Sequence, residues 1–521
     1  MRIFFILLAA GWLGGAGLWA SEVRFSLRSD PRTMDPLAVS DQASEAVRYL
    51  TTARLVRVHA KTRALEPELA VSWKLSAGNR VLTFRLRPGV RFSDGSPFGG
   101  RDVVHTLRAL LDPKRNLPAG EELRTLPIVS VESPKADEVV VKFAEALAAP
   151  ALYFSEIPMV PASGAGAGLG PFRVAQYERG RQIRFEKNPH YWKGAGYPAA
   201  SAVVVEILPS AEIERGAWTA GRLDFLETVD PAFFDQIAGT GAARDSGPTA
   251  EAEVLWFNLN ENAPIPTHKK AWFQNREFRR AISRLIRRED LARIVYRGRG
   301  TGGSGPFLPG SPWAVRRPAA AAAKVEEVVA GLARIGFRRD GGGVMRDGAG
   351  NAVEISIATN ASNRARMQIL SLLQADLGRA GIKVTPAGLD MPSLLERMGG
   401  SKSYEAIVLG LTGVSDDPNQ QMTVWLSSSA NHPWRPGQAK PGTAWEAEID
   451  DLLRRQLKTV DVGKRKALLE RFQRIVDEEA PLLYLVHPHA LSAVLPKLKN
   501  AAPGNHRPRV YWNIDQLEGV R

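Results

Sequence analysis

The sequence has no cysteine among its 521 residues. This absence excludes disulfide bonds, thiol catalysis, cysteine-bound zinc and a lipid anchor attached through a thioether. We therefore expect a protein that is stabilised by its hydrophobic cores alone and is not tethered to a membrane through a cysteine.

Long apolar runs are missing as well. The N-terminal run at 3–10 follows Arg2 and is broken by glycines from residue 11 onward, well short of the roughly 20 apolar residues that a membrane-spanning helix needs. A cationic tip, a short apolar run and small residues are typical of a secretory signal peptide. We predict that residues 1–20 form this signal peptide, with cleavage after Ala20 and export to the periplasm. The alternative is an uncleaved anchor.

Three familiar catalytic motifs are absent. The sequence contains no Gly-x-Ser-x-Gly elbow, no His-Glu-x-x-His helix and no Gly-x-x-x-x-Gly-Lys phosphate loop. His487 and His489 lie two residues apart on an expected strand, but no acidic residue lies near them in sequence to complete a metal site. We expect no enzymatic activity, no cofactor and no bound metal.

The composition is that of an ordinary folded protein, with 44% hydrophobic and 24% charged residues. A single core stops growing at roughly 250 to 300 residues, so two or more domains are expected. The formal net charge is +14, but Lys and Arg are scattered among 55 acidic residues, with no basic run that is interleaved with aromatics. We expect a solvated cationic surface and no nucleic-acid partner.

Residue periodicity predicts a mixed α/β fold. Apolar residues alternate with polar ones from Leu82 to Leu86, which is typical of a strand, and recur at helical spacing from Val103 to Leu111. Beyond Val254, strands alternate with helices, which favours a predominantly parallel α/β lobe. The elements expected there include strands at 353–358, 382–385, 404–411 and 482–486 and helices at 364–380, 445–458 and 462–479.

Seven motifs follow one another in a fixed order along the chain. They are TMDP at 33–36, LTFRLRPGVRFSDGSP at 82–97, GPFRV at 170–174, NPHYWKG at 188–194, FNLN at 257–260, FRRAI at 278–282 and GSP at 310–312. In these motifs the chain resembles the family of extracytoplasmic solute-binding proteins that includes the dipeptide-, oligopeptide- and nickel-binding components of ABC transporters. The resemblance covers nearly the whole chain beyond the predicted signal peptide.

This resemblance implies a two-lobed fold with hinge crossover strands and an extra α+β subdomain in the N-terminal lobe. It places the N-terminal lobe at 21–254, with the inserted subdomain at about 48–167 and a return of the chain at 487–521, and the second lobe at 255–486. A small solute is expected in the cleft between the lobes. Because a closed cleft gains contacts only when solute is present, binding would shift the hinge population toward closure.

The loop after the expected strand 404–411 is a candidate ligand site. Open α/β sheets bind ligands outside the carboxyl ends of their strands, and Asp416 and Asp417 follow such an end. Asp417 is equally suited to cap a helix that starts near Pro418. In dipeptide- and oligopeptide-binding relatives, an aspartate of this segment pairs with the peptide's α-amino group, and the alignment puts Val414 there. Either a shift of one or two residues lets Asp416 pair with the α-amino group, or the solute has no amine to neutralise.

Seven further residues complete the candidate site: Ser40, Asp41, Gln42, Trp256, Asn258, Trp425 and Trp434. The resemblance marks Ser40, Asp41 and Gln42 as a ligand-facing segment. It marks Trp256 and Asn258 as part of a crossover strand near the cleft. Trp425 and Trp434 flank the acidic loop and could form apolar pocket walls. Core packing is the alternative for the tryptophans, and satisfying exposed strand groups is the alternative for the asparagine.

Together these features predict the substrate-binding component of an ABC importer. We expect a monomer that captures a peptide or peptide-like solute and delivers it to permease subunits in the inner membrane. Two alternatives stay open: a secreted hydrolase of peptides or related amides, and a protein of the same fold that binds an opine, a sugar or a metal chelate.

Overall fold

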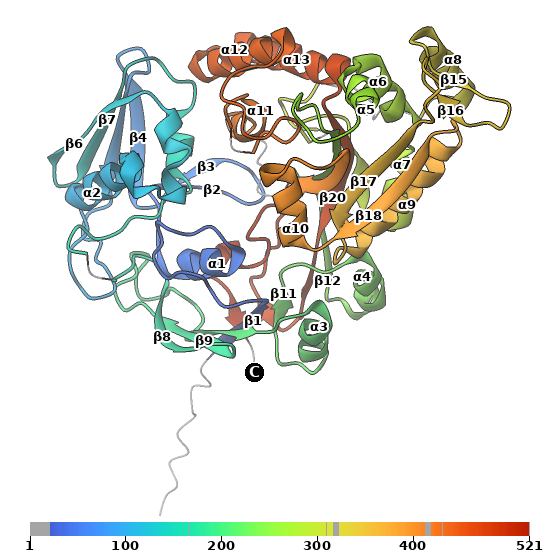
Figure 1. Cartoon of the computed structure of the whole chain (residues 1–521). Helices are drawn as coiled ribbons and strands as arrows, with labels where there is room; N and C mark the ends of the chain where they lie inside the picture. The colour runs from blue at the N-terminus through green and yellow to red at the C-terminus, as the bar shows by residue number, and fades with distance from the viewer. Residues whose placement is uncertain are drawn as a thin grey trace, which may run out of the picture.

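The computed structural model describes residues 21–164, 166–308, 310–315, 322–411, 418–429 and 431–519. The predicted signal peptide at 1–20 lies outside these residues. Strands and helices are mixed along the described chain, and three larger sheets carry the architecture (Figure 1). Within the described ranges no helix is both long enough and apolar enough to cross a membrane.

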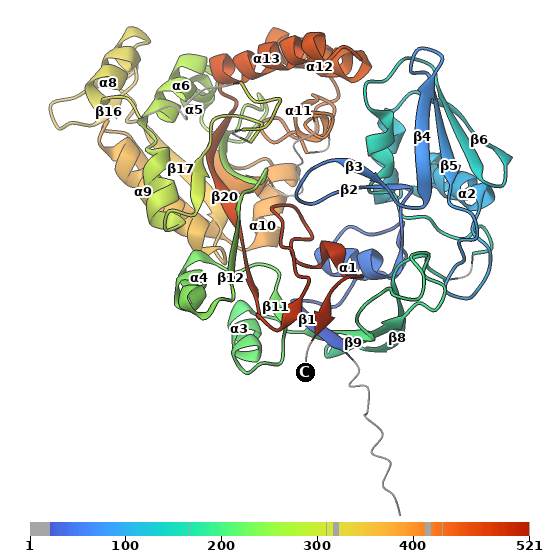
Figure 2. The same cartoon turned by 180° about the vertical axis from the view of Figure 1, so that it is seen from behind.

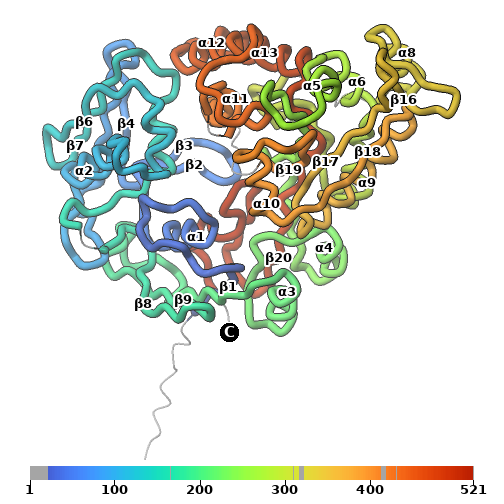
Figure 3. Tube along the Cα trace, in the orientation of Figure 1, coloured from blue at the N-terminus to red at the C-terminus, as the bar shows by residue number. Residues whose placement is uncertain are grey.

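The N-terminal sheet has the strand order β1-β10-β9-β8. Its strands are β1 (Glu22–Leu27), β8 (Phe172–Glu178), β9 (Gln182–Lys187) and β10 (Ala202–Ile207). Helix α1 (Gln42–Thr51) shares a core with this sheet through Ala46, Val47 and Leu50. The C-terminal segment returns beside β1 (Figure 3), where Ser21 Oγ donates to the carbonyl of Gly519 at 2.8 Å.

The side sheet is antiparallel, with the order β4-β5-β7-β6, and lies within the predicted inserted subdomain. Its strands are β4 (Ala70–Ser76), β5 (Val81–Leu86), β6 (Ile128–Lys135) and β7 (Glu138–Phe143). Helix α2 (Gly100–Leu111) packs against β6 and β7. Because Leu82, Phe84 and Leu86 alternate along β5, all three enter the core.

The large sheet has the order β11-β20-β13-β19-β17-β18, with β12 and β14 paired to β20. Its strands are β11 (Phe225–Leu226), β12 (Ala243–Pro248), β13 (Ala252–Phe257), β14 (Gly300–Gly302), β17 (Glu354–Asn360), β18 (Lys383–Leu389), β19 (Ala406–Leu411) and β20 (Leu482–Val494). Only β17, β18 and β19 pair in parallel. The expectation of a predominantly parallel lobe is wrong, because β13 and β20 enter the sheet antiparallel to their neighbours.

Helices surround the large sheet (Figures 1 and 2). They are α3 (Ala211–Thr219), α4 (Pro231–Ile237), α5 (Thr267–Gln274), α6 (Arg276–Leu285), α7 (Arg288–Asp290), α8 (Val325–Arg334), α9 (Arg364–Gly378), α10 (Met391–Leu395), α11 (Met422–Trp425), α12 (Ala444–Lys458) and α13 (Val462–Glu479). The helices predicted at 445–458 and 462–479 are confirmed as α12 and α13. Thr443 and Asp461 start them by accepting backbone N–H bonds with their side chains.

Strand β20 crosses from one half of the molecule to the other (Figure 2). Its first half, from Leu482 to Val486, pairs with β13, and its second half pairs with β11 and β12. β12 and β13 are consecutive in the chain, so the segment 249–251 between them crosses at the same place. Two adjacent segments therefore join the two halves, as the resemblance implied for the crossover strands.

The halves also touch away from this crossover. The backbone N–H of Ala148, in the loop after β7, donates to the carbonyl of Leu457 near the end of α12 at 2.9 Å. Beside it, Lys458 forms an ion pair with Glu145. Figure 1 shows α12 reaching toward the side sheet at the end of the molecule opposite β11 and β1.

Candidate functional site

The crossover has a buried histidine at its centre. His487 is fully buried, and its Nδ1 donates to the carbonyl of Glu251 at 3.1 Å. Burial lowers the pKa of His487 to about 4, so the imidazole is neutral near pH 7. His489 instead contacts the Asp245 carboxylate at 3.1 Å. No cluster of three or more metal-ligating side chains occurs among the residues that the structure describes.

The C-terminal tail holds the crossover in place through charge. Glu251 pairs with Arg507 at 2.6 Å and with Arg509 at 3.4 Å. The Glu227 carboxylate accepts backbone N–H groups of Arg509 and Val510. Asn505 Nδ2 donates to the carbonyl of Pro248, at the end of β12. The tail loop 505–510 therefore holds the crossing segment 249–251 in place.

A cavity of about 110 Å³ lies beside this tail loop. Its walls come from α1, the hairpin of β2 (Val56–Val58) and β3 (Leu65–Pro67), and the tail. Four arginines and three glutamates are among its lining residues, which are Gln42, Glu45, Tyr49, Arg54, Arg57, Val58, Ala60, Arg63, Ser155, Glu156, Glu227, His506, Arg507, Pro508, Tyr511 and Trp512. We take this arginine cavity as the candidate functional site, because it adjoins the segments about which the halves would move.

Of the predicted ligand-facing segment, only Gln42 lines the arginine cavity. Asp41 is the N-cap of α1: one carboxylate oxygen accepts the N–H groups of Ala43 and Ser44, and the other accepts the Ser44 hydroxyl at 2.6 Å. Ser40 is exposed. Asp41 therefore has a structural role as a helix cap. Ligand binding by Ser40, Asp41 and Gln42 stays a prediction.

The predicted crossover residues Trp256 and Asn258 lie inside the core, 2% and 1% exposed. Asn258 Nδ2 donates to the carbonyls of Lys402 and Tyr404, and its Oδ1 accepts the N–H of Asn260. Asn258 therefore braces the start of β19 against β13.

The two predicted wall tryptophans are also buried. Trp425 and Trp434 pack with ring centroids 5.0 Å apart and planes tilted by 54°, and Trp434 Nε1 donates to Glu446 at 3.0 Å. Neither lines the arginine cavity. Val414, Asp416 and Asp417 lie outside the described residues, so the acidic loop stays a prediction.

A buried charged network lies in the large sheet at the carboxyl ends of β17 and β19. Arg366, at the start of α9, pairs with Glu253 of β13 at 2.8 Å and donates to Asn360 Oδ1 at the end of β17. The backbone approaches closely here, since a Cβ atom on Gly410 would lie 2.3 Å from the Arg366 guanidinium. Sequence reasoning missed this network, because its members lie on four separate elements.

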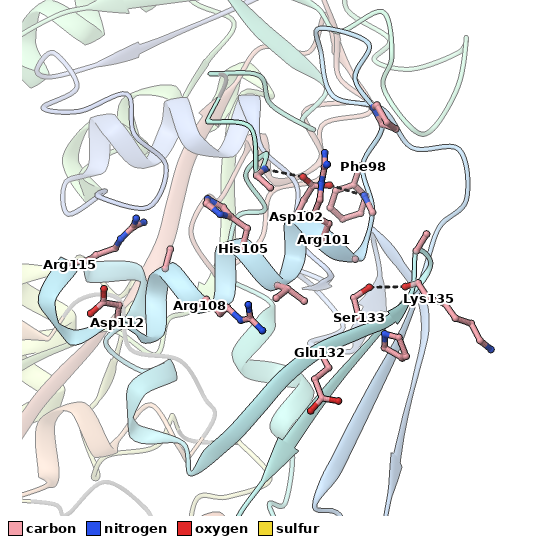
Figure 4. A pocket seen from close by; sticks show the side chains of 18 residues that line it. Phe98, Arg101, Asp102, His105, Arg108, Asp112, Arg115, Glu132, Ser133 and Lys135 are labelled. Carbon is pink, nitrogen blue, oxygen red and sulfur yellow. Dashed lines mark hydrogen bonds between the residues drawn. The ribbon is translucent and has the colours of Figure 1, made fainter.

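A larger hollow of about 1090 Å³ lies on the outer face of the side sheet, between α2 and β6 (Figure 4). Arg101, His105, Arg108 and Arg115 follow one another along its helical wall, and Lys135 lies on the opposite strand. None of the predicted site residues lines it. It lies within one substructure, away from the crossover, so relative movement of the halves would not open or close it.

Comparison with known proteins now identifies the family. Residues 64–433 match the family described as bacterial extracellular solute-binding proteins, family 5 Middle. The chain belongs to this family. It is 26% identical to a probable ABC transporter-binding protein of Deinococcus radiodurans, over 88% of this chain and 85% of that protein. It is also 26% identical to di/tripeptide-binding protein 2 of Pseudomonas aeruginosa, over 81% of each chain.

The fold of this family 5 protein matches solved structures of two-lobed relatives. The crystal structure of NikA from Brucella suis in complex with Fe(III)-EDTA superposes with a TM-score of 0.82 at 21% identity, over 95% of this chain and 100% of that one. The predicted family, the two-lobed mixed α/β fold and the general role of an ABC transporter solute-binding component are thereby confirmed. The exact lobe boundaries stay a prediction.

Proposed function

We propose that this protein is exported to the periplasm, captures a peptide or peptide-like small solute between its lobes and delivers it to ABC permease subunits. The observation that carries the proposal is the crossover, where the chain passes between the halves in two adjacent segments, β20 and 249–251, beside a polar cavity. A hinge of two adjacent segments permits closure without disturbing either core.

The contact between Ala148 and Leu457 supports the closing movement. Its polar part is a backbone hydrogen bond with a neighbouring ion pair, and the ion-paired side chains of Glu145 and Lys458 are each 47% exposed. Exposed pairs contribute little, about 0 to 1 kcal/mol. Leu147 and Leu457 also belong to one buried apolar cluster, so opening here exposes apolar surface, and solute contacts within the cleft would help to decide the balance between open and closed forms.

A ligand screen tests the proposal directly. Purified mature protein is heated with peptides, opines, sugars and metal chelates, since the relatives include a di/tripeptide-binding protein and a structure with Fe(III)-EDTA. A cognate solute should raise the unfolding temperature in proportion to ln(1 + [L]/Kd). If no class raised it, the proposed transport role would be rejected.

Three cheaper measurements check the remaining parts. N-terminal sequencing of periplasmic protein should begin at Ser21, and light scattering should give the mass of one chain. Peptide mixtures incubated with the protein should be recovered intact by mass spectrometry, because we infer binding without catalysis. Cleaved products would support the hydrolase alternative instead.

A further inference from the structure

Helix α2 carries a row of basic side chains along the larger hollow on the outer face of the side sheet, the outer hollow. Arg101, His105 and Arg108 recur at spacings of four and three residues, which places them on one side of the helix. Arg115 continues the row just beyond the helix, and Lys135 ends the facing strand β6 (Figure 4). The three arginines and the lysine are exposed. Four exposed cations therefore line one hollow.

The carboxylates of the outer hollow leave this positive charge in excess. Asp102 is 2% exposed, and both of its oxygens accept backbone N–H groups. Asp112 also accepts a backbone N–H, and Glu132 is paired with Lys142 at 3.1 Å. None of the four exposed cations forms an ion pair or a side-chain hydrogen bond with a described residue. Four cations thus face two carboxylates that are not paired with a cation.

Helix α6 carries a comparable row of arginines that is neutralised. Arg276, Arg280 and Arg284 recur there at spacings of four residues. Their carboxylate partners are Glu479 at 3.2 Å, Glu277 at 3.0 Å and Glu327 at 3.5 Å, respectively. The row on α2 has as many arginines as the row on α6, but no described carboxylate is paired with any of them.

We propose that the outer hollow is a docking site for an extended acidic segment of a partner protein. A cleft lined by charges of one sign focuses the electric field and attracts groups of the opposite sign, and each guanidinium can bind a carboxylate through two hydrogen bonds. Helix α2 has 12 residues, which is about 18 Å at a rise of 1.5 Å per residue. An extended segment of about five residues has the same length.

The shape of the outer hollow favours a polypeptide segment over the alternatives. Its volume of about 1090 Å³ lies above the roughly 300 to 1,000 Å³ of small-molecule sites. A chain that lies along α2 brings several carboxylates to the row at once. A flat anionic bilayer, in contrast, reaches only the rim of a recessed site.

Docking in the outer hollow does not depend on the solute. All lining residues lie within the stretch 97–162, which carries α2, β6 and β7, so closure about the crossover moves the hollow as one body. The acidic segment would tether the protein to its partner in the empty and the loaded state alike. This role goes beyond the proposed function, which concerns the cleft between the lobes.

Fluorescence anisotropy with labelled hexaglutamate tests the docking site, and hexaglutamine is the uncharged probe. Wild type should give a saturable signal with hexaglutamate at low salt and none with hexaglutamine. The triple variant Arg101→Ser/Arg108→Ser/Arg115→Ser should bind hexaglutamate about tenfold more weakly, because three charge contacts are lost. Thermal unfolding should show that this variant is folded, since the three side chains are exposed.

The triple variant Arg276→Ser/Arg280→Ser/Arg284→Ser is the matched control, because it removes the same three charges from a formal net charge of +14. It should weaken the binding of hexaglutamate by at most about twofold, since these arginines already have partners. Equal losses in the two triple variants would show attraction to net charge alone and overturn the site. Absence of binding to wild type, or equal binding of hexaglutamine, would overturn it as well.

A carbodiimide, which couples a carboxylate to a nearby lysine amine, locates the bound peptide without any variant. Hexaglutamate should couple to Lys135, and coupling only to lysines of the second lobe would contradict the site. Vesicles of phosphatidylcholine and phosphatidylglycerol test the membrane alternative. They should bind wild type and the α2 variant equally, and a selective loss in the α2 variant would assign the row to a membrane and overturn the proposal.

The affinity for hexaglutamate should be the same with and without a bound solute, and a clear difference would refute the tether that ignores the loaded state. The docking site and the transport role fail separately. A ligand screen without a hit leaves hexaglutamate binding as it is, and a cognate solute is bound whether or not hexaglutamate is.

Discussion

Replacing Glu446 by glutamine should destabilise the second lobe without touching the arginine cavity. The Glu446 side chain is 2% exposed and accepts hydrogen bonds from Trp434 Nε1 at 3.0 Å and from the Gly442 N–H at 2.8 Å. The Arg435 guanidinium lies 3.2 Å away. Glutamine has the same shape, but its amide N–H groups would face these donors.

The pKa of Glu446 gives the size of the effect. Burial by itself would raise this pKa, but interactions with His432, Trp434 and Arg435 outweigh burial and lower it to about 2. From the ordinary value of 4.5, this shift corresponds to about 3 kcal/mol of stability. Because the folded-state pKa is depressed, the contribution is complete above about pH 5 and disappears as the pH falls toward 2.

Urea unfolding followed by tryptophan fluorescence measures this contribution. Glu446→Gln should lower the free energy of unfolding by about 3 kcal/mol at pH 7, and its difference from wild type should shrink to about 1 kcal/mol at pH 3. Glu448→Gln is the control, because Glu448 lies on the same helix, pairs with Arg471 and is 42% exposed. It should cost at most about 1 kcal/mol. Equal losses in the two variants would refute the reasoning.

Three further changes have defined outcomes. Asp41→Ala should lower the free energy of unfolding by about 1 kcal/mol, because it removes the cap of α1, and an unchanged thermal unfolding curve would contradict that role. Arg366→Met should cost about 3 to 5 kcal/mol by leaving the Glu253 carboxylate buried and unpaired. Adding Glu253→Gln should recover most of this loss in denaturant titrations, and a double variant as unstable as the single one would argue against the pair. Finally, burial lowers the pKa of His487 to about 4, so unfolded chains take up a proton between about pH 6.5 and 4 that folded chains refuse. As the pH falls through that window, the free energy of unfolding should decrease more steeply for wild type than for His487→Gln. Parallel pH profiles of the two proteins would contradict this.

The helices of the second lobe could be predicted because their signals are local. Thr443 and Asp461 precede the amphipathic segments that became α12 and α13, and capping is decided within one turn. Strand β20 was predicted to end at 486 but continues to Val494. Its continuation through Pro488 depends on β12 and β14, strands that lie far away in sequence.

The candidate site was harder to predict, because burial and pairing depend on the whole fold. Asp41 has a side chain suited to a cap as well as to a ligand, and sequence alone could not choose between them. The pair of Arg366 and Glu253 gave no signal, since 113 residues separate its two members in the chain.

Movement of the lobes can be measured directly, because a chain without cysteine can be labelled at two chosen sites. Spin labels on Lys114→Cys, beside α2, and Ser371→Cys, on α9, would report the distance between the halves; both positions are exposed. With a solute whose binding calorimetry has verified, the distance distribution should become narrower and move toward that of the structure described above. An identical distribution with and without the bound solute would contradict closure about the crossover.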